Sequence, residues 1–241
     1  MKGVILAGGD ATRLRPLTKI TSKQLLPVYD RPMIYYPIQT LVSSGIKDIL
    51  IIISPLYSGH FLNLLGSGKE FGAHFSYAIQ EAPKGLADAF IVGEDFLDND
   101  NATMILGDNI FDNNGFAKEI KSFKSGAMVF AKKVKDPERF GVVEFDKKGN
   151  VLSIEEKPKK PKSNYVVVGL YIYDNRVVKY AKSLTPSARG EIEITDLNNI
   201  YLNEGQLKVN LFDGLWADAG TFDSLLEVSK YMGNKAKKVN K

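Results

Sequence analysis

The feature that most constrains the fold of this chain is the alternation of short runs rich in Ile and Val with longer segments of helical period. Four of these runs predict strands, at residues 2–7, 48–54, 75–80 and 103–107. Because the runs are apolar throughout, they are typical of strands covered on both faces of a parallel sheet. Helices are expected between them, at residues 34–44, 60–65, 86–96 and 116–123. We therefore expect an α/β fold, Rossmann-like, with a largely parallel mixed sheet flanked by helices.

The pattern changes after residue 126, where short apolar segments follow one another closely. Segments 127–134, 140–146 and 151–157, with the turn Lys147-Lys148-Gly149-Asn150 before the last, predict an antiparallel meander. A strand is expected at 165–174, a helix from about Thr195, and a closing helix after Thr221. Since no linker interrupts the pattern, we expect one domain over residues 1–229.

The charge of the chain is concentrated at one end. The formal net charge is +4, and residues 230–241 contain five lysines and no acid, so the remainder is close to neutral. We expect these residues to form a basic, flexible tail, and we expect neither nucleic acid nor a membrane as a partner. The sequence has no Cys and only two His, which excludes disulfides and thiolate zinc sites and suits a reducing compartment. No run approaches the roughly 18 apolar residues of a membrane span, so a cytoplasmic location is expected.

A glycine-rich loop follows the first expected strand. Gly8 and Gly9 are followed closely by Arg13 and Arg15. Glycines let backbone N–H groups approach phosphate oxygens, and a guanidinium adds a planar pair of donors. The loop matches neither a P-loop nor the dinucleotide fingerprint, so taken alone it indicates either a phosphate site or only a turn.

Two acidic residues occur where strands are expected to end, Asp108 in MILGDN and Asp218 in LWADAG. Ligands of open α/β sheets bind outside the carboxyl ends of the strands, where a carboxylate can hold magnesium. A strand-terminal Asp can equally form a cap or turn, so each position is a candidate only.

A wider resemblance covers nearly the whole chain. It is carried, in order, by GGDATRLRPLT, SKQLLPVYDRPMIYYPIQTL, ILGDNIF, DPERFGVVEFD, EEKP, SNYVVVGLYIYD and PSARGEIEITDLN. Together these stretches resemble the sugar-1-phosphate nucleotidyltransferases, and among them the glucose-1-phosphate thymidylyltransferases. The resemblance implies transfer of a thymidylyl group from dTTP to glucose-1-phosphate, with Mg²⁺ as cofactor. It also implies a homo-oligomer and the first step of dTDP-rhamnose or related deoxysugar synthesis.

The resemblance implies a role for each matched residue. Nucleotide-binding positions are Gly8, Gly9, Thr12, Arg13, Gln80, Gly85 and Asp108, with Arg13 and Lys23 catalytic and Asp108 and Asp218 the metal ligands. Positions for the sugar phosphate are Gly141, Glu156, Lys157, Val167, Tyr171 and Arg189, in the expected antiparallel region. Since the attacking phosphate oxygen is already an anion, no general base is required.

Two departures from the family pattern stand out. Ala11 replaces a usual Gly, so a positive φ there would strain the loop. Many members also continue with a further helical segment, which places subunit contacts and any regulatory site in question. Two alternatives to the expected activity stay open: a UTP- or CTP-using hexose-1-phosphate nucleotidyltransferase, and an inactive domain that senses sugar nucleotides.

Overall fold

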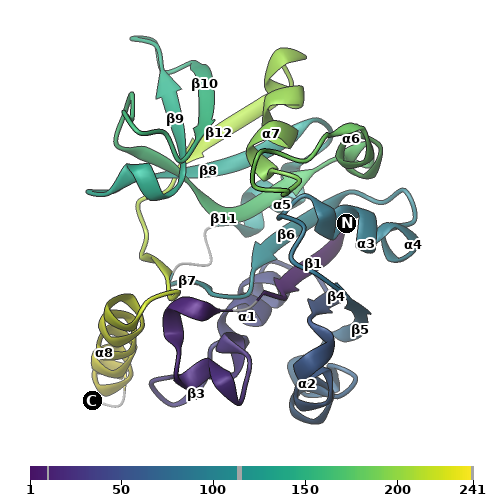
Figure 1. The fold of residues 1–241 in the computed structure, drawn as a ribbon, viewed down its shortest axis with the longest axis vertical. Helices are drawn as coiled ribbons and strands as arrows, with labels where there is room; N and C mark the ends of the chain where they lie inside the picture. Colours follow the sequence, from purple (N-terminus) through teal and green to yellow (C-terminus); the bar gives the residue numbers. More distant parts are fainter. Residues whose placement is uncertain (10, 113–115, 240–241) are drawn as a thin grey trace. The chain divides into compact units, whose positions relative to one another are not determined.

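The computed structural model describes residues 1–9, 11–112 and 116–239 (Figure 1). The chain divides into two compact units, each described by itself below. Unit 1 comprises Met1–Lys2, Lys84–Met104 and Ser122–Asp213, and unit 2 comprises Gly3–Pro83, Ile105–Lys121 and Gly214–Lys241. The division falls within β6 (Ala102–Leu106).

Unit 2 is built on three parallel strands, β1 (Lys2–Ala7), β4 (Asp48–Ile53) and β5 (His74–Ile79). β4 lies in the middle and is buried from Ile49 to Ile53, as its run of Ile and Leu predicts. Ala7 pairs with Ile53, and Ile53 pairs with Ile79. The carboxyl ends of the three strands therefore meet at one edge.

The helices of unit 2 begin and end close to their expected positions. They are α1 (Tyr35–Ser43), α2 (Ser58–Leu65), α5 (Ala117–Ser122) and α8 (Phe222–Val239), with α5 ending at the division. Short 3-10 helices are η1 (Thr12–Leu14), η2 (Leu17–Lys19), η3 (Lys23–Leu25), η4 (Pro55–Tyr57) and η5 (Lys69–Phe71). α8 starts with a reciprocal cap, in which the Ser224 N–H donates to Thr221 Oγ1 at 3.3 Å and the Thr221 N–H donates to Ser224 Oγ at 3.1 Å.

Four very short strands complete unit 2: β2 (Pro27–Val28), β3 (Arg31–Pro32), β7 (Asn109–Phe111) and β13 (Trp216–Asp218). β2 pairs with β3 and β7 pairs with β13, both antiparallel. An apolar cluster joins these ribbons to α1 and α8, and it includes Val28, Tyr36, Ile110, Val228 and Met232. The β7–β13 ribbon is thereby anchored to the helices on which it rests.

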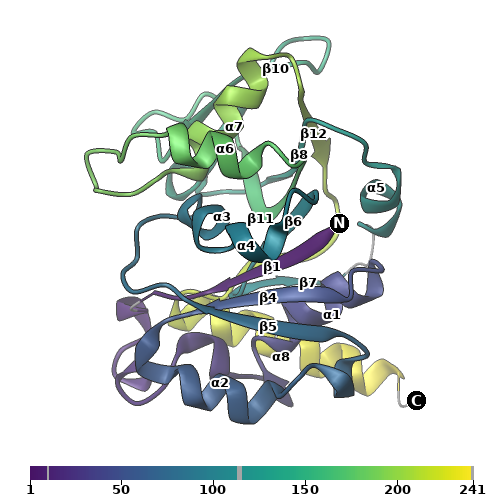
Figure 2. The ribbon, with the colours of Figure 1, turned by 90° about the vertical axis from the view of Figure 1, so that its right-hand side faces the viewer.

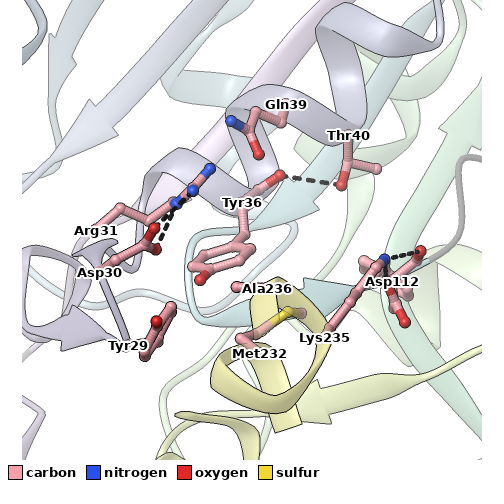
Figure 3. Close-up of a pocket in the computed structure, with 11 residues that line it drawn as sticks. Tyr29, Asp30, Arg31, Tyr36, Gln39, Thr40, Asp112, Met232, Lys235 and Ala236 are labelled. Carbon is pink, nitrogen blue, oxygen red and sulfur yellow. Dashed lines mark hydrogen bonds and ion pairs between the residues drawn. The ribbon is translucent and has the colours of Figure 1, made fainter. Parts of the chain in front are cut away.

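Beside this cluster, a hollow of about 460 Å³ is lined by residues of the β2–β3 hairpin, α1 and α8 (Figure 3). Met232 and Lys235 reach it from α8, and Lys235 forms an ion pair with Asp112. The domain end expected at residue 229 thus falls within a continuous helix, and Met232 beyond it is buried. Asn240 and Lys241 lie outside the described residues.

Unit 1 contains five further strands: β8 (Ala127–Lys133), β9 (Gly141–Phe145), β10 (Val151–Glu156), β11 (Tyr165–Tyr173) and β12 (Leu207–Leu211). β9 and β10 form the expected antiparallel hairpin around Gly149. The expected meander is wrong at its first step, because β8 pairs with β11 and β12 instead of β9. β11, nine residues long, pairs with both β8 and β9 and so separates them.

The helices of unit 1 are α3 (Asp88–Val92), α4 (Glu94–Leu97), α6 (Val177–Ser183) and α7 (Ile194–Asn203), with the 3-10 helix η6 (Pro137–Arg139) before β9. α6 and α7 lie side by side (Figures 1 and 2). The buried carboxylate of Asp174 joins them: it accepts bonds from the Gly126 N–H at 2.7 Å, from Arg176 Nη2 at 2.7 Å and from Tyr201 Oη at 3.0 Å. Burial alone would raise the pKa of Asp174, but these bonds outweigh it and lower the pKa.

The expected fold class is confirmed, since parallel strands flanked by helices occur together with antiparallel strands. Within the described ranges, no helix combines the length and the apolar character needed to cross a membrane.

Candidate active site

The loop after β1 has the backbone shape that the glycine pair predicts. Gly9 has φ +110°, which glycine adopts without strain. Ala11 has φ +44° and ψ +40°, so the left-handed conformation expected to be strained for alanine is present. The Thr18 hydroxyl donates to the Ala11 carbonyl at 2.8 Å and supports it. Thr12 and Arg13 follow in η1 and are both exposed, while Asp10 lies outside the described residues.

Gln80 lies directly beside this loop. It follows β5 at the same edge of the sheet, its N–H donates to the Ile53 carbonyl at 2.9 Å, and it is buried. A Cβ atom placed on Gly8 would lie 3.1 Å from Gln80 Oε1. The structure therefore brings together the loop glycine and the amide that the family resemblance assigns to the pyrimidine base.

Asp108 is held at this edge by its neighbours. The Gly107 N–H donates to the Leu6 carbonyl at 2.9 Å, which ties the residue before Asp108 to β1. Lys23 forms an ion pair with Asp108 Oδ2, and Asn109 Nδ2 donates to Oδ1 at 2.9 Å. Burial would raise the pKa of Asp108, but the charge and hydrogen bond of Lys23 outweigh this effect and lower the pKa. Asp108 is thus an ionised carboxylate although it is buried.

Asp218 is brought to the same place by the β7–β13 ribbon. It pairs with Asn109, and the Ala219 N–H donates to the Asp108 carbonyl at 3.0 Å. Gly220 lies between two charged groups, because a Cβ atom there would be 2.9 Å from both Arg13 Nη2 and Asp218 Oδ1. Arg13, Lys23, Asp108 and Asp218, expected to act together, therefore converge with Gly8 and Gln80; we call these six residues the unit 2 cluster.

Metal binding by this cluster would depend on the substrate. The described residues contain no group of three or more His, Asp or Glu side chains that could enclose a metal ion. Asp218 at the end of β13 and Asp108 directly before β7 are nevertheless a suitable donor set for Mg²⁺, which retains water and binds substrate phosphates as well. The residues present fit such an ion.

A second cluster lies in unit 1, at the end of the β9–β10 hairpin. Gly141 pairs with Glu156 across the two strands. The Thr195 hydroxyl donates to Glu156 Oε2 at 2.6 Å, and a Cβ atom on Gly141 would lie 3.1 Å from Thr195 Oγ1. A side chain at position 141 would therefore crowd the Thr195 hydroxyl that binds Glu156, the carboxylate that the family resemblance assigns to the sugar.

Two cations accompany Glu156. Lys157 Nζ lies 3.1 Å and Arg189 Nη2 lies 3.4 Å from Glu156 Oε1. Lys157 has φ +43°, a conformation that non-glycine residues seldom adopt, and its N–H donates to the Phe140 carbonyl at 3.0 Å. Arg189 is also bound by Glu193, at 2.8 Å. We call Gly141, Glu156, Lys157, Arg189, Glu193 and Thr195 the unit 1 cluster.

Three further candidates lie in unit 1 outside this cluster: Val167, Tyr171 and Gly85. Val166 pairs with Val142, so Val167 lies next to Gly141 across β9 and β11, whereas Tyr171 is buried with its ring stacked on that of Tyr173. Gly85 has φ +102°, and a Cβ atom there would lie 2.4 Å from the Ile192 carbonyl oxygen. A glycine is thus required at position 85 for packing, and its contact with the base stays a prediction.

Four residues that hold the candidates in place were not predicted from the sequence: Asn109, Gly220, Glu193 and Thr195. Each stands within two residues of a matched motif or candidate, in ILGDNIF, LWADAG or GEIEITD. Their position close to these motifs was the signal that could have found them. Their roles could not be predicted in this way, because they depend on hydrogen bonds between residues far apart in the chain, such as that from Trp216 Nε1 to Asn109 Oδ1 at 2.6 Å. Chemically, each cluster combines cations for phosphate with carboxylates for a metal ion or sugar hydroxyls.

Comparison with known proteins matches residues 2–235 to the family described as nucleotidyl transferase. The glucose-1-phosphate thymidylyltransferase of Neisseria meningitidis is 54% identical over 237 residues, which cover 96% of this chain and 82% of that protein. The enzyme of that name from Mycobacterium tuberculosis H37Rv is 50% identical with the same coverage. A crystal structure from Bacillus anthracis bearing the same enzyme name, in complex with sucrose, has a TM-score of 0.90, 48% identity, and coverage of 96% of this chain and 94% of that one. A UDP-glucose pyrophosphorylase bound to UDP-glucose is 24% identical and has a TM-score of 0.85, covering 97% of this chain and 98% of that one, which shows a shared fold.

Proposed function

This chain belongs to the nucleotidyl transferase family, and we propose that it transfers the thymidylyl group of dTTP to glucose-1-phosphate, giving dTDP-glucose and pyrophosphate. The observation that carries this proposal is the convergence of Arg13, Lys23, Asp108 and Asp218 beside the glycine loop and Gln80. Relatives with about half of their residues identical over 96% of the chain bear the name of this activity.

The reaction needs charge neutralisation more than proton transfer. A phosphate oxygen of glucose-1-phosphate forms a bond to the α-phosphorus, and the bond from that phosphorus to the bridging oxygen breaks as pyrophosphate leaves with the electron pair. Two unit charges about 4 Å apart repel by about 4 kcal/mol at an effective dielectric constant near 20. Cations that are already in position remove this repulsion without having to reorganise during the reaction.

On the nucleotide side, the glycine loop of Gly8 and Gly9, with Thr12, receives the triphosphate, and Arg13 and Lys23 neutralise its charge. Gln80 offers a donor and an acceptor to the edge of the pyrimidine, and a contact of Gly85 with the base is part of the same proposal.

Asp108 and Asp218 would hold Mg²⁺, which supplies positive charge to the phosphates when bound. In the structure Lys23 occupies one oxygen of Asp108, and the ionised state of this carboxylate suits both a cationic side chain and a metal ion. Binding of the nucleotide would give Lys23 a phosphate as its alternative partner.

On the sugar side, Lys157 and Arg189 bind the phosphate of glucose-1-phosphate, and the Glu156 carboxylate accepts hydrogen bonds from sugar hydroxyls. Gly141 and Val167 contact the sugar, and Tyr171 lines the same pocket. We also propose a homo-oligomer in the cytoplasm that acts at the start of dTDP-rhamnose or related deoxysugar synthesis. The alternatives, a UTP- or CTP-using enzyme and an inactive sensor domain, are not favoured by the relatives.

Pyrophosphate release from dTTP and glucose-1-phosphate in Mg²⁺ tests the proposal. The wild-type chain is expected to release pyrophosphate, and chelation of the metal is expected to stop it. Asp108→Asn and Asp218→Asn should each lower kcat by at least about 10-fold, because each removes charge from the site at nearly constant volume, and circular dichroism is expected to show that the fold is kept. More than a tenth of the wild-type rate at saturating Mg²⁺ would refute the ligand assignment, and a wild-type chain inactive with dTTP would refute the function.

A further inference from the structure

Glu193 is a buried acid at the edge of the unit 1 cluster, immediately before α7. The side chain of Glu193 is only 9% exposed, whereas the side chain of Arg189, which it binds, is 41% exposed. Glu193 Oε1 accepts from Arg189 Nε at 3.2 Å and Nη2 at 2.9 Å, and Oε2 accepts from Nη2 at 2.8 Å. The Ser187 hydroxyl adds a fourth bond, to Oε1, at 2.6 Å.

The other carboxylates near Arg189 hold it less closely. Glu156 and Glu191 each lie 3.4 Å from Nη2, and each makes a single contact. An arginine side chain that is four-tenths exposed has many rotamers, so its direction depends on the partner that binds it in a fixed geometry. Glu193 is that partner, because it contacts two nitrogens of the planar guanidinium.

We propose that Glu193 is a positioning residue for the sugar phosphate, which it orients by holding the Nε and Nη2 atoms of Arg189. These two atoms make all the side-chain hydrogen bonds of Arg189 within the described ranges, so Nη1 is left to bind a phosphate oxygen. Glu193 itself touches no substrate. The inference deepens the proposed function and rests on it for the identity of the ligand, a hexose 1-phosphate.

The same turn of chain also holds the carboxylate assigned to the sugar. Thr195, two residues after Glu193, donates to Glu156 Oε2 at 2.6 Å. The start of α7 therefore positions both the cation for the phosphate and the acceptor for the sugar hydroxyls. Since both residues belong to one short segment, the spacing between the two groups is set by the backbone of that segment.

Steady-state kinetics of Glu193→Gln test this role. The amide keeps the size of the side chain but loses its charge and one of its acceptor atoms. We expect the KM for glucose-1-phosphate to rise at least about 10-fold, with the KM for dTTP changed less than about twofold. Glu191→Gln is the matched control, since it removes the same charge near Arg189 without the double contact, and its KM values should change less than about twofold.

A double-mutant cycle separates positioning from a general structural effect. If Glu193 acts through Arg189, then Glu193→Gln should add less than about twofold to the KM for glucose-1-phosphate in an Arg189→Ala background. Should Glu193→Gln fail to fold, as judged by circular dichroism, the cycle is made with Glu193→Asp, which keeps the charge but shortens the side chain.

An unchanged KM for glucose-1-phosphate, equal losses for both substrates, or full additivity with Arg189→Ala would each overturn the inference. These outcomes require an active wild-type chain. They therefore differ from a failure of the proposed function, in which the wild-type chain itself would not use dTTP and glucose-1-phosphate.

Discussion

Gly220 leaves room for the side chains of two charged residues, Arg13 and Asp218. The position of its missing Cβ is 2.9 Å from the ends of both Arg13 and Asp218, and its φ is not positive. The backbone could therefore accept alanine without strain, and only the two side chains would have to move. Gly220 thus acts on the unit 2 cluster through the space that it leaves.

For this reason we expect Gly220→Ala to separate activity from stability. The methyl group should displace Arg13 and Asp218, so kcat for pyrophosphate release should fall at least about 10-fold. Because both displaced groups are side-chain ends, the melting temperature should change by no more than about 2 °C. Gly59→Ala, where a Cβ atom meets nothing within 4 Å, is the control. Wild-type kcat in the Gly220 variant would contradict the arrangement.

At the scale of elements, unit 1 depends on polar groups that tie strand ends to helices. Asp174, just after β11, accepts bonds from Gly126, Arg176 and Tyr201. Gly85 lets the chain pass close to Ile192, whose N–H donates to the Lys84 carbonyl at 2.7 Å. Ile192 belongs to the segment that leads into α7, so its hydrogen bond to Lys84 supports the neighbouring Glu193 and Thr195.

Asp174→Asn should lower the free energy of unfolding at pH 7 by about 2–3 kcal/mol, because it removes a buried, multiply bonded charge. The pKa of Asp174 is lowered in the folded state, so its stabilising effect is complete above the ordinary value of 3.8. That effect is lost as the pH falls through the lowered value. The difference between variant and wild type, measured by urea unfolding, should therefore shrink below about pH 4. A difference that stays constant down to pH 2.5 would show that the charge of Asp174 is not what stabilises this region.

Gly85→Ala tests the close approach between the two backbone segments. Gly85 and Gly149 both have positive φ, but only at Gly85 would a Cβ atom collide with backbone, 2.4 Å from the Ile192 oxygen. Gly149→Ala should lower the free energy of unfolding by about 1 kcal/mol, because alanine is strained at a positive φ. Gly85→Ala should lower it by at least about 2 kcal/mol more, because the added methyl group also meets backbone atoms. Equal losses of stability in urea unfolding would mean that the segments can move apart freely.

For the molecule as a whole, the sequence predicted long, uniform elements best. β1 occupies residues 2–7 as expected, because six residues of consistent pattern are enough to define a buried strand. A single helix expected at 86–96 is divided into α3 and α4 at Gly93, since glycine weakens a helix and allows its axis to change. The strands β2, β3, β7 and β13 were missed because two or three residues carry no detectable period.

The residues of the candidate site that lie in recognisable sequence motifs could be predicted. Arg13, Lys23, Asp108 and Asp218 come from separate stretches, and the structure brings them together. Glu193 was not predicted: it lies four residues after Arg189, but the segment between them is a turn before α7, so the i,i+4 rule for helices does not apply to this pair. Such supporting residues are defined by three-dimensional geometry, and local sequence shows only that they stand near a motif.

The central claim, transfer of a thymidylyl group to glucose-1-phosphate, is tested most directly by competition in one reaction. Equal concentrations of dTTP, UTP, CTP, ATP and GTP are mixed with glucose-1-phosphate and Mg²⁺, and the initial nucleotide sugars are quantified by mass spectrometry. Their ratios give the ratios of kcat/KM, which measure discrimination between the bases. We predict that dTDP-glucose exceeds every other product by at least about 10-fold. An equal or greater yield of UDP-glucose or of any other nucleotide sugar would contradict the account.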